Sequence, residues 1–520
     1  MDMDKRRKPS RRRSEPRRVI RGRWFGALAL AVLGASGSAH AQSVRVTPTL
    51  DTELTWTDNA SASRGGTAGG DGSDWILEVS PGISVSRTSG RLNGSLSARL
   101  RNLLYADNTD NSTSYLSLQG SGTFEAIEDL LFIDFDAGIS RSNLSAFSGG
   151  AAGDPLASSR ANETRTWSIA PRLESELRFG ESARGSVQYS SRGITSGSEG
   201  LGNQSVDTLS VNLADPGGFR FFGWGVAYTR TESDGGTAAT SSRTEETVRG
   251  TLFANLSPQF RLRGIVGHES NDYDNGREDS GSIVGAGFDW YPTDRTAISA
   301  TVEDRIFGRG YDVSFNHRMR RSVWFVNASR DLSSFAQELG NAIVFDQACL
   351  NLVSNPAYRP DITDPALRQF LLLECLGIVS LRSNAAYVNQ SVGGGFSLLG
   401  VRNTLSFSVT RADRSLVSNV SGLLPGDDFL NTDRVRTTST TLSWSHQLTG
   451  TSSLDAALTR SESEGRDDPT LETTRLLGSL GVSRALGPNT QTSLRYRYQK
   501  AEGSTDYTEN AITATLGMRF

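Results

Sequence analysis

The feature that most constrains this 520-residue chain is an alternation of apolar and polar residues that recurs from about residue 44 to the C-terminus. In the segment 494–499, Leu-Arg-Tyr-Arg-Tyr-Gln, every second residue is apolar. Successive side chains of a β-strand point to opposite faces of the sheet, so each such segment predicts a strand with one apolar and one polar face. The chain is therefore expected to be almost entirely β-sheet.

Short turns and longer polar loops join these segments in strict alternation. Pro292–Arg295 and Leu486–Asn489 are short turns, whereas 145–164 and 414–433 are long loops. Counting the alternation gives about 22 strands, an even number of the kind found in single-chain bacterial barrels. The predicted fold class is all-β: a single large antiparallel transmembrane β-barrel formed by residues 42–520, with both termini at the end that carries the short turns.

Charged residues occupy the polar face of many of these strands. A charged side chain at the lipid midplane costs about 2–4 kcal/mol, so this face is expected to line the lumen. The candidate lumen-lining residues are Arg99, Arg101, Asp134, Asp136, Glu174, Glu176, Arg184, Arg261, Arg263, Arg495 and Arg497. Both signs occur, so the set does not predict whether the lumen selects for charge. Aromatic residues near strand ends, including Tyr105, Trp224 and Trp444, are expected to form girdles at the membrane interfaces.

The composition agrees with a barrel better than with a soluble protein of this length. Hydrophobic residues make up 36% of the chain, which is low for a globular domain. A soluble protein of this size needs more apolar side chains to fill its cores. A barrel needs fewer, because only its outward face must be apolar and its interior is wet.

The N-terminal segment has the order of a secretory signal peptide. Residues 1–23 contain 11 Lys and Arg, Trp24–Leu33 is apolar, and Ala39-His40-Ala41 fits a small-x-small cleavage site. Residues 1–41 are therefore the expected signal peptide, since the apolar run is too short to span ~30 Å of hydrocarbon. Its removal leaves 43 basic and 54 acidic residues. This acidic balance argues against nucleic acid as a partner.

One interval, 331–384, loses the alternation and gains helical signals. Asp364-Pro365 is typical of a helix N-cap followed by proline at the first helical position. The only two cysteines, Cys349 and Cys375, lie in this interval, and export places them in an oxidising compartment. We expect a long loop of two short helices joined by a Cys349–Cys375 disulfide. Such a loop could enter the mouth of the barrel or cap it from outside. The alternatives for the cysteines are two free thiols or a metal pair without histidine partners.

The last strand, Ile512–Phe520, ends on an aromatic residue and so resembles the signal by which bacterial outer-membrane barrels reach their assembly machinery. Phe520 is the expected assembly signal. Four segments (Leu54–Asn59, Val79–Val85, Leu100–Tyr105 and Asp364–Arg368) together resemble the outer-membrane β-barrel family associated with PEP-CTERM/exosortase and exopolysaccharide systems. The resemblance covers essentially the whole mature chain.

This resemblance implies a bacterial outer-membrane location and a role as a channel or assembly component in exopolysaccharide export. The implied partners are outer-membrane lipid and lipopolysaccharide, the barrel assembly machinery, exopolysaccharide and periplasmic export proteins. No cofactor is implied, and no functional residue can be assigned from the family. The alternatives are a general diffusion porin and a structural or docking barrel without transport.

The sequence gives little support for an enzyme or for an outer-membrane transporter with a plug domain. His268, Ser270 and Asp272 share one face of a strand, but nothing supplies an oxyanion hole, so the chain is expected not to be an enzyme. The acidic segment 272–279 lacks a full calcium-binding loop pattern. A plugged outer-membrane transporter has a similar strand number. However, the first predicted strand begins close to Gln42, which leaves no room for a plug.

Overall fold

The structure is a computed structural model of the whole chain. It describes Val44–Phe520 except residues 61–71, 142–144, 148–162, 176–182, 197–202, 216–220, 236–242, 274–276, 335–336, 339–380, 384, 418–422, 424–425, 469 and 504–505. The expected signal peptide, residues 1–41, lies outside the described residues.

The described part of the chain contains 22 β-strands, as the alternation predicted. They are β1 (Val44–Thr57), β2 (Asp74–Ser89), β3 (Leu92–Tyr105), β4 (Thr113–Ile127), β5 (Leu131–Arg141), β6 (Glu163–Ser175), β7 (Arg184–Ser196), β8 (Asn203–Asp215), β9 (Phe222–Asp234), β10 (Arg243–Ser257), β11 (Phe260–Tyr273), β12 (Arg277–Thr293), β13 (Thr296–Arg305), β14 (Gly308–Arg318), β15 (Ser322–Ser334), β16 (Ala386–Leu399), β17 (Asn403–Leu416), β18 (Arg434–Thr449), β19 (Ser452–Gly465), β20 (Glu472–Ala485), β21 (Thr490–Gly503) and β22 (Tyr507–Arg519).

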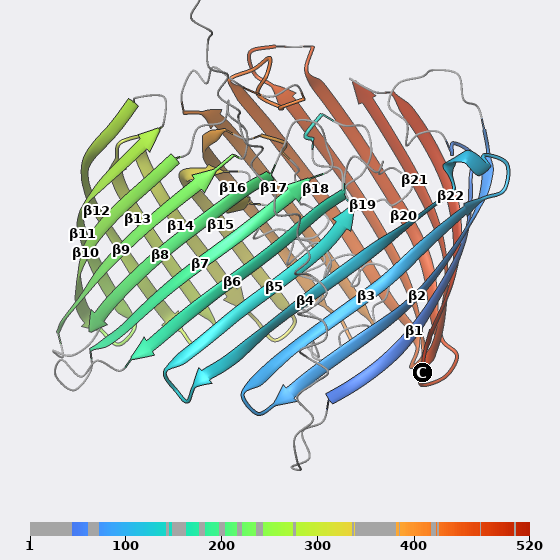
Figure 1. Cartoon of the computed structure of the whole chain (residues 1–520), viewed down its shortest axis with the longest axis horizontal. Coiled ribbons are helices and arrows are strands. Elements are labelled where there is room, and N and C mark those ends of the chain that lie inside the picture. Colours follow the sequence, from blue (N-terminus) through green and yellow to red (C-terminus); the bar gives the residue numbers. More distant parts are fainter. Residues whose placement is uncertain are drawn as a thin grey trace, which may run out of the picture. The chain divides into compact units, whose positions relative to one another are not determined.

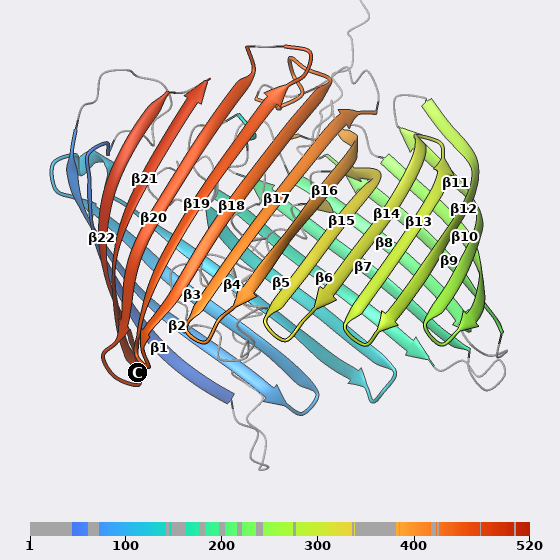
Figure 2. The ribbon, with the colours of Figure 1, turned by 180° about the vertical axis from the view of Figure 1, so that it is seen from behind.

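Every strand pairs antiparallel with its neighbours in the sequence, and the ring closes where β1 pairs with β22. Thr49–Thr57 of β1 lie opposite Ala511–Arg519 of β22. The result is a closed barrel with tilted strands and no free sheet edge (Figures 1 and 2). A 14-residue strand such as β1 spans about 46 Å at ~3.3 Å per residue. At a tilt of ~40°, about 35 Å remain along the axis, enough to cross an apolar band ~25 Å tall.

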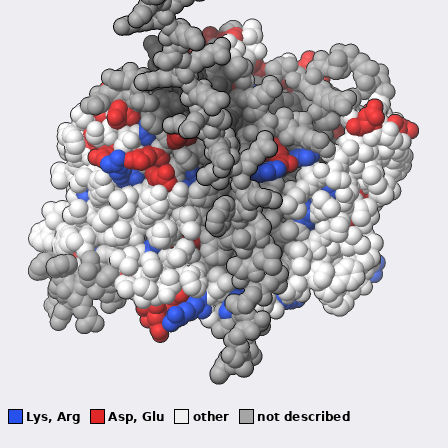
Figure 3. All heavy atoms as spheres, viewed as in Figure 1, with Lys and Arg blue, Asp and Glu red and all other residues white. Residues whose placement is uncertain are grey.

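The two faces of the barrel wall differ in the way that the alternation predicts. Large apolar side chains are exposed on one face, with Val266 64% exposed beside Val284 at 59% on the neighbouring strand. Charged residues occupy the positions between them. Figure 3 shows charges gathered toward the two ends of the visible outer surface, with a largely uncharged band between them. The apolar face is therefore the outer face, and the alternating positions form the inner face.

The two ends of the barrel also differ. The short turns, the start of β1 and the C-terminus lie at one end (Figure 1), here called the short-turn end. The backbone N–H of Phe520 donates to the carbonyl of Pro48 in β1 at 3.0 Å, which ties the C-terminus to this end. The opposite end, here called the long-loop end, carries longer connections, with the exception of the two-residue turn between β13 and β14.

Tyr105 was expected to lie in a membrane girdle on the outer face, but its side chain lies on the inner face. Tyr105 is only 7% exposed and packs with Ile76, Leu103 and Tyr115 in a buried apolar cluster. In β3 it follows exposed Leu104, so the alternation places it on the inner face. The assignment of Tyr105 to a membrane girdle was wrong because proximity to a strand end does not distinguish the two faces.

The boundary of the long insert also needs correction. Residues 331–334 continue β15, with Asp331 opposite Asn389 and Ser334 opposite Ala386. The pairing with β16 holds them as strand, so the insert begins after Ser334 rather than at 331. Gln337 and Glu338 are helical. Cys349, Cys375 and the helices expected around them lie outside the described residues. No helix among the described residues is long and apolar enough to cross a membrane.

Candidate functional site

The inner face carries a dense group of charges where the barrel closes. We call it the seam cluster; it comprises Asp51 and Glu53 of β1, Glu78 of β2, Arg99 and Arg101 of β3, Arg497 of β21 and Glu509 of β22. Arg101 donates two hydrogen bonds of 2.6 Å to Glu78, one to each carboxylate oxygen. A planar guanidinium that meets both oxygens of a carboxylate is a strong and directional pair.

Four other charges of the seam cluster also form pairs, whereas Glu53 accepts a hydrogen bond from Thr55 at 3.4 Å. Arg99 lies 3.6 Å from Asp51, and Arg497 lies 2.9 Å from Glu509. Thr57 donates to Glu509 at 2.9 Å. Three of the sequence-predicted arginines therefore meet carboxylates that the sequence analysis did not select. The alternation of their strands places these carboxylates on the inner face, as it does the arginines. Only the strand register shows which arginine each carboxylate meets.

The remaining predicted residues are spread around the inner wall. Arg172 lies 3.4 Å from Asp134 and also contacts Glu174. Ser168 donates to Asp136 at 2.7 Å. Arg263 lies 3.2 Å from Asp289, and Arg261 donates to Asn255 at 2.8 Å.

Three other predicted residues complete the set. Arg184 is exposed at the start of β7. Arg495 pairs in register with Thr513 of β22. Glu176 lies outside the described residues. Whether the predicted residues line a conducting lumen stays a prediction.

A second sector of the inner face is built from hydroxyl groups. It covers β16–β19 and is here called the hydroxyl wall; its buried members are Ser397, Ser406, Ser408, Thr437, Ser439, Thr441, Ser443, Thr459 and Ser463. Ser397 and Ser406 lie 2.8 Å apart, and Thr441 and Thr459 lie 3.3 Å apart. Arg414 and Asp455 are the charged residues at inner-face positions of these four strands. The sequence analysis missed this wall because it searched the polar faces for charge.

The start of the long insert rests on this sector of the inner face. Glu338 accepts a hydrogen bond from Asn389 of β16 at 2.8 Å and one from Arg414 of β17 at 3.0 Å. Asn389 and Arg414 are cross-strand partners on the inner face. The first helical residues of the insert therefore contact the inside of the barrel wall.

Three further segments meet at the long-loop end in what we call the mouth cluster. These are Ser145–Phe147 after β5, Leu381–Ser383 before β16, and Gly426–Phe429 between β17 and β18. Asp428 lies at the centre: it accepts hydrogen bonds from Ser145 Oγ at 2.6 Å and from the backbone N–H groups of Ala146 and Arg382, both at 2.8 Å. Burial raises the pKa of Asp428, while these hydrogen bonds act in the opposite direction.

The mouth cluster joins opposite halves of the barrel. Figures 1 and 2 show β5 and β6 on one side and β16–β20 on the other. Arg475 of β20 donates to the carbonyl of Ala146 at 2.6 Å, and Thr473 donates to that of Phe147 at 3.1 Å. Apolar packing adds to these bonds, with the rings of Tyr387 and Phe429 5.8 Å apart. The segment after β5 therefore reaches across the long-loop end to the facing wall.

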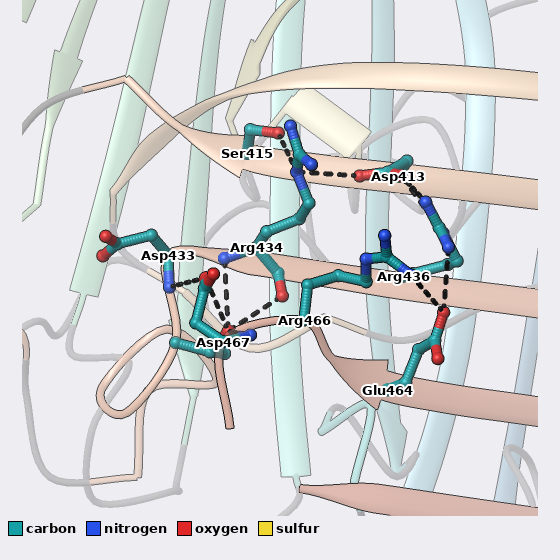
Figure 4. Close-up of polar contacts among 9 residues, drawn as sticks. Asp413, Ser415, Asp433, Arg434, Arg436, Glu464, Arg466 and Asp467 are labelled. Atoms are coloured by element: carbon teal, nitrogen blue, oxygen red, sulfur yellow. Dashed lines mark hydrogen bonds and ion pairs between the residues drawn. The ribbon is translucent and has the colours of Figure 1, made fainter. Parts of the chain in front are cut away.

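The outer face at the same end carries a chain of ion pairs, shown in Figure 4 and called the rim chain. Arg436 bridges Asp413 at 2.7 Å and Glu464 at 3.1 Å. Arg434 also lies 3.4 Å from Asp413, and Arg466 lies 3.7 Å from Glu464. Arg436 shares the alternation of exposed Leu442 on β18, so the chain lies outside the barrel. It suits the polar headgroup region rather than the lumen.

The possible hydrolytic group does not face the lumen. His268 lies opposite Val248 of β10, and both share the outer face with exposed Val266. Within the described ranges, no group of three or more His, Cys, Asp or Glu side chains could hold a metal ion. The groups of the inner wall described above are hydroxyls, carboxylates and guanidinium groups, which offer hydrogen bonds and charge.

No family model matches the chain, and no curated protein matches it. Among solved structures, the siderophore receptor PirA from Acinetobacter baumannii aligns over 93% of this chain and 81% of its own, with 10% identity and a TM-score of 0.48. The FrpB iron transporter from Neisseria meningitidis aligns over 91% and 81%, with 10% identity and a TM-score of 0.49. The siderophore receptor PirA from Pseudomonas aeruginosa covers 93% and 81%, with 11% identity and a TM-score of 0.44. Likeness at this level carries no functional argument.

Proposed function

We propose that the protein is a bacterial outer-membrane β-barrel through which exopolysaccharide leaves the cell. The membrane assignment rests on the closed 22-stranded ring and on the apolar band around its outer face. Closed barrels and helices are the structures that satisfy every backbone group inside a bilayer. The ion pairs of the rim chain then lie at one membrane surface, where charged side chains are tolerated.

The observation that carries the substrate proposal is the hydroxyl wall. Serine and threonine hydroxyls both donate and accept, and they rotate to suit a partner, so they can exchange hydrogen bonds with sugar hydroxyls along a chain. A largely uncharged wall also holds no salt or metal tightly. The resemblance in the first, second and third strands to barrels of exopolysaccharide systems supports the same substrate.

In the described part of the chain, contacts cover the hydroxyl wall and bridge the long-loop end. The nine residues of the hydroxyl wall are at most 8% exposed, and the mouth cluster crosses the long-loop end. Export would therefore require that these contacts separate. The expected partners are the barrel assembly machinery, which would insert the chain, and periplasmic proteins that deliver the polymer.

Permeation through a reconstituted barrel tests this proposal. We would compare the intact protein with the double variant D428A/R382A, which removes the centre of the mouth cluster, by single-channel conductance and by dextran efflux from liposomes. The expected result is low conductance for the intact protein and a large increase for the variant, with passage of dextran chains. The variant R309A/R460A, which changes two exposed residues outside the mouth cluster, is the matched control and should behave like the intact protein.

Two other functions correspond to other outcomes of this experiment. The first alternative is a general diffusion porin. It is favoured by the three arginine–carboxylate pairs of the seam cluster, because paired charges largely cancel and leave no strong electric field to attract one kind of solute. It predicts passage of ions and small sugars in the intact protein and exclusion of dextran from both forms. A structural or docking barrel predicts no conductance in either form, and that result would contradict both channel functions.

A further inference from the structure

Three consecutive turns at the short-turn end are rich in arginine. The β12–β13 turn contains Arg295, the end of β14 and the turn after it contain Arg318, Arg320 and Arg321, and the β16–β17 turn contains Arg402. These five residues are here called the arginine lip. Asp294 is the one acidic residue in the same turns. The β4–β5 turn at the same end differs, because it carries Glu128 and Asp129, so a basic character is not general to this end.

The turns of the arginine lip lie side by side. The backbone N–H of Arg318 donates to the carbonyl of Arg295 at 2.8 Å, and the N–H of Leu399 donates to the carbonyl of Arg321 at 2.8 Å. Figure 2 shows these turns next to one another along the lower edge of the barrel. The arginines of neighbouring turns therefore follow one another along this end of the barrel.

Four of the five side chains have no partner among the residues that the structure describes. Arg295, Arg320, Arg321 and Arg402 are exposed, and none makes a side-chain hydrogen bond or ion pair with another described residue. The arginines of the seam cluster differ, because Arg101 is held by Glu78 in a bidentate pair. Paired charges deeper in the barrel largely cancel, whereas the charges of the lip act outward into solvent.

The lip borders the end of the lumen. Arg318 closes β14 opposite Val323, and both follow the alternation of the inner face. On nearby β11, Arg261 also occupies an inner-face position, where it donates to Asn255. A row of exposed positive charges at an opening concentrates anions there. Guanidinium groups also match carboxylates in shape, since both are planar and form two parallel hydrogen bonds.

We propose that the arginine lip binds the carboxylates of an anionic exopolysaccharide at the short-turn end, before the chain enters the lumen. The inference rests on the proposed function and narrows its substrate to glycans that carry uronate groups. Capture takes place at the lip, and the hydroxyl wall then contacts the sugar hydroxyls. The net charge of the inner wall does not select the substrate.

Binding in detergent tests the proposal without requiring an open channel. Full-length protein would be titrated with oligogalacturonides, and with dextran oligosaccharides of equal length as the neutral probe. The variant R295Q/R320Q/R321Q/R402Q is compared with R91Q/R309Q/R460Q/R484Q, which removes the same charge from exposed arginines elsewhere. The expected result is at least tenfold weaker binding of oligogalacturonide by the lip variant, unchanged binding by the control, and no dextran binding. Added salt should weaken the intact interaction.

Two results would overturn the proposal. If both variants bind oligogalacturonide equally weakly, the glycan is attracted only by the net charge of the protein and not by the arginine lip. Unchanged oligogalacturonide binding, with loss of co-purified anionic phospholipid from the lip variant only, would make the row a lipid headgroup site. Because closed protein can bind at its rim, failure here is separate from failure of the permeation experiment, and each can occur without the other.

Discussion

The carboxylate of Asp428 accepts a hydrogen bond from the backbone N–H of Ala146 at 2.8 Å, although 282 residues separate them in the sequence. Ala146 follows β5 and Asp428 precedes β18, so this bond joins opposite halves of the ring. Asp428 also holds Ser145 and the backbone of Arg382. One side chain thus connects three segments at the long-loop end, and its removal should affect all three.

We expect D428A to open the mouth cluster. The substitution leaves the N–H groups of Ala146 and Arg382 without their acceptor, and a buried donor left unsatisfied costs about 1–3 kcal/mol. Hydrogen exchange at these two amides should therefore become about tenfold to a hundredfold faster. Amides in the middle of β18 serve as the internal control and should not change. Unchanged exchange at Ala146 would show that the apolar packing alone holds the segment.

The same bond gives a dependence on pH with a defined sign. Burial raises the pKa of Asp428 in the folded protein, so protonation favours the assembled cluster. Protonated Asp428 therefore stabilises the mouth cluster fully at pH values below the ordinary pKa of a carboxyl group. This stabilisation is lost as the pH rises through the raised pKa of Asp428 in the folded protein. Among the described residues, the charged groups around Asp428 are Arg382, Asp427 and Arg475. After correction for intrinsic exchange rates, the Ala146 amide should be better protected at pH 4 than at pH 7.

D428N is the matched variant for this effect. Its amide oxygen can still accept from Ala146 and Arg382, and its NH₂ group can donate to the Ser145 hydroxyl. The cluster should stay assembled, and the dependence on pH should disappear. A pH dependence that persists in D428N would assign the titration to another group, with Asp427 the first to examine.

In the seam cluster, R101A should destabilise the barrel. The substitution leaves Glu78, with a side chain only 10% exposed, without its bidentate partner. Breaking a buried pair costs about 3–5 kcal/mol, and we expect about 3 because Arg101 keeps some contact with solvent. Guanidinium unfolding in liposomes, followed by tryptophan fluorescence, measures the loss. The double variant E78L/R101L should recover most of it, and a double variant as unstable as R101A would contradict the ion-pair explanation.

The alternation of faces makes a direct prediction about charge. V266R places an arginine at an outer position that is 64% exposed in the isolated barrel. In a bilayer this position meets lipid, so the variant should lose about 2–4 kcal/mol. S210R, at an inner position between Gln188 and Thr229, should lose much less. Folding yields into liposomes compare the two, and equal losses would contradict the assignment of the faces.

The sequence predicted the strands because a period of two is a local signal that each segment carries by itself. It did not predict which acid meets Arg101, since Glu78 reaches that arginine only through the register of β2 and β3. The mouth cluster has no periodic signal, because Ala146 and Asp428 lie in irregular segments. The start of the long insert was also misplaced. Leu332 alternates with its neighbours as a strand residue does, but the helical signals that follow it led to the assignment of residues 331–334 to the insert rather than to the strand.

The first residues of the insert provide a final prediction. Glu338 is the ion-pair partner of Arg414, whose side chain is 6% exposed, and it also accepts from Asn389. E338A removes both contacts and leaves the Arg414 guanidinium buried without its counter-charge, which should cost about 1–3 kcal/mol and release the start of the insert from the wall. Hydrogen exchange at the backbone amide of Gln337 should become faster, whereas E338Q, which can still accept from Asn389, should give an intermediate rate. If this amide exchanges equally in E338A and the intact protein, the contact of Glu338 with the wall is not what holds residues 337–338 in place.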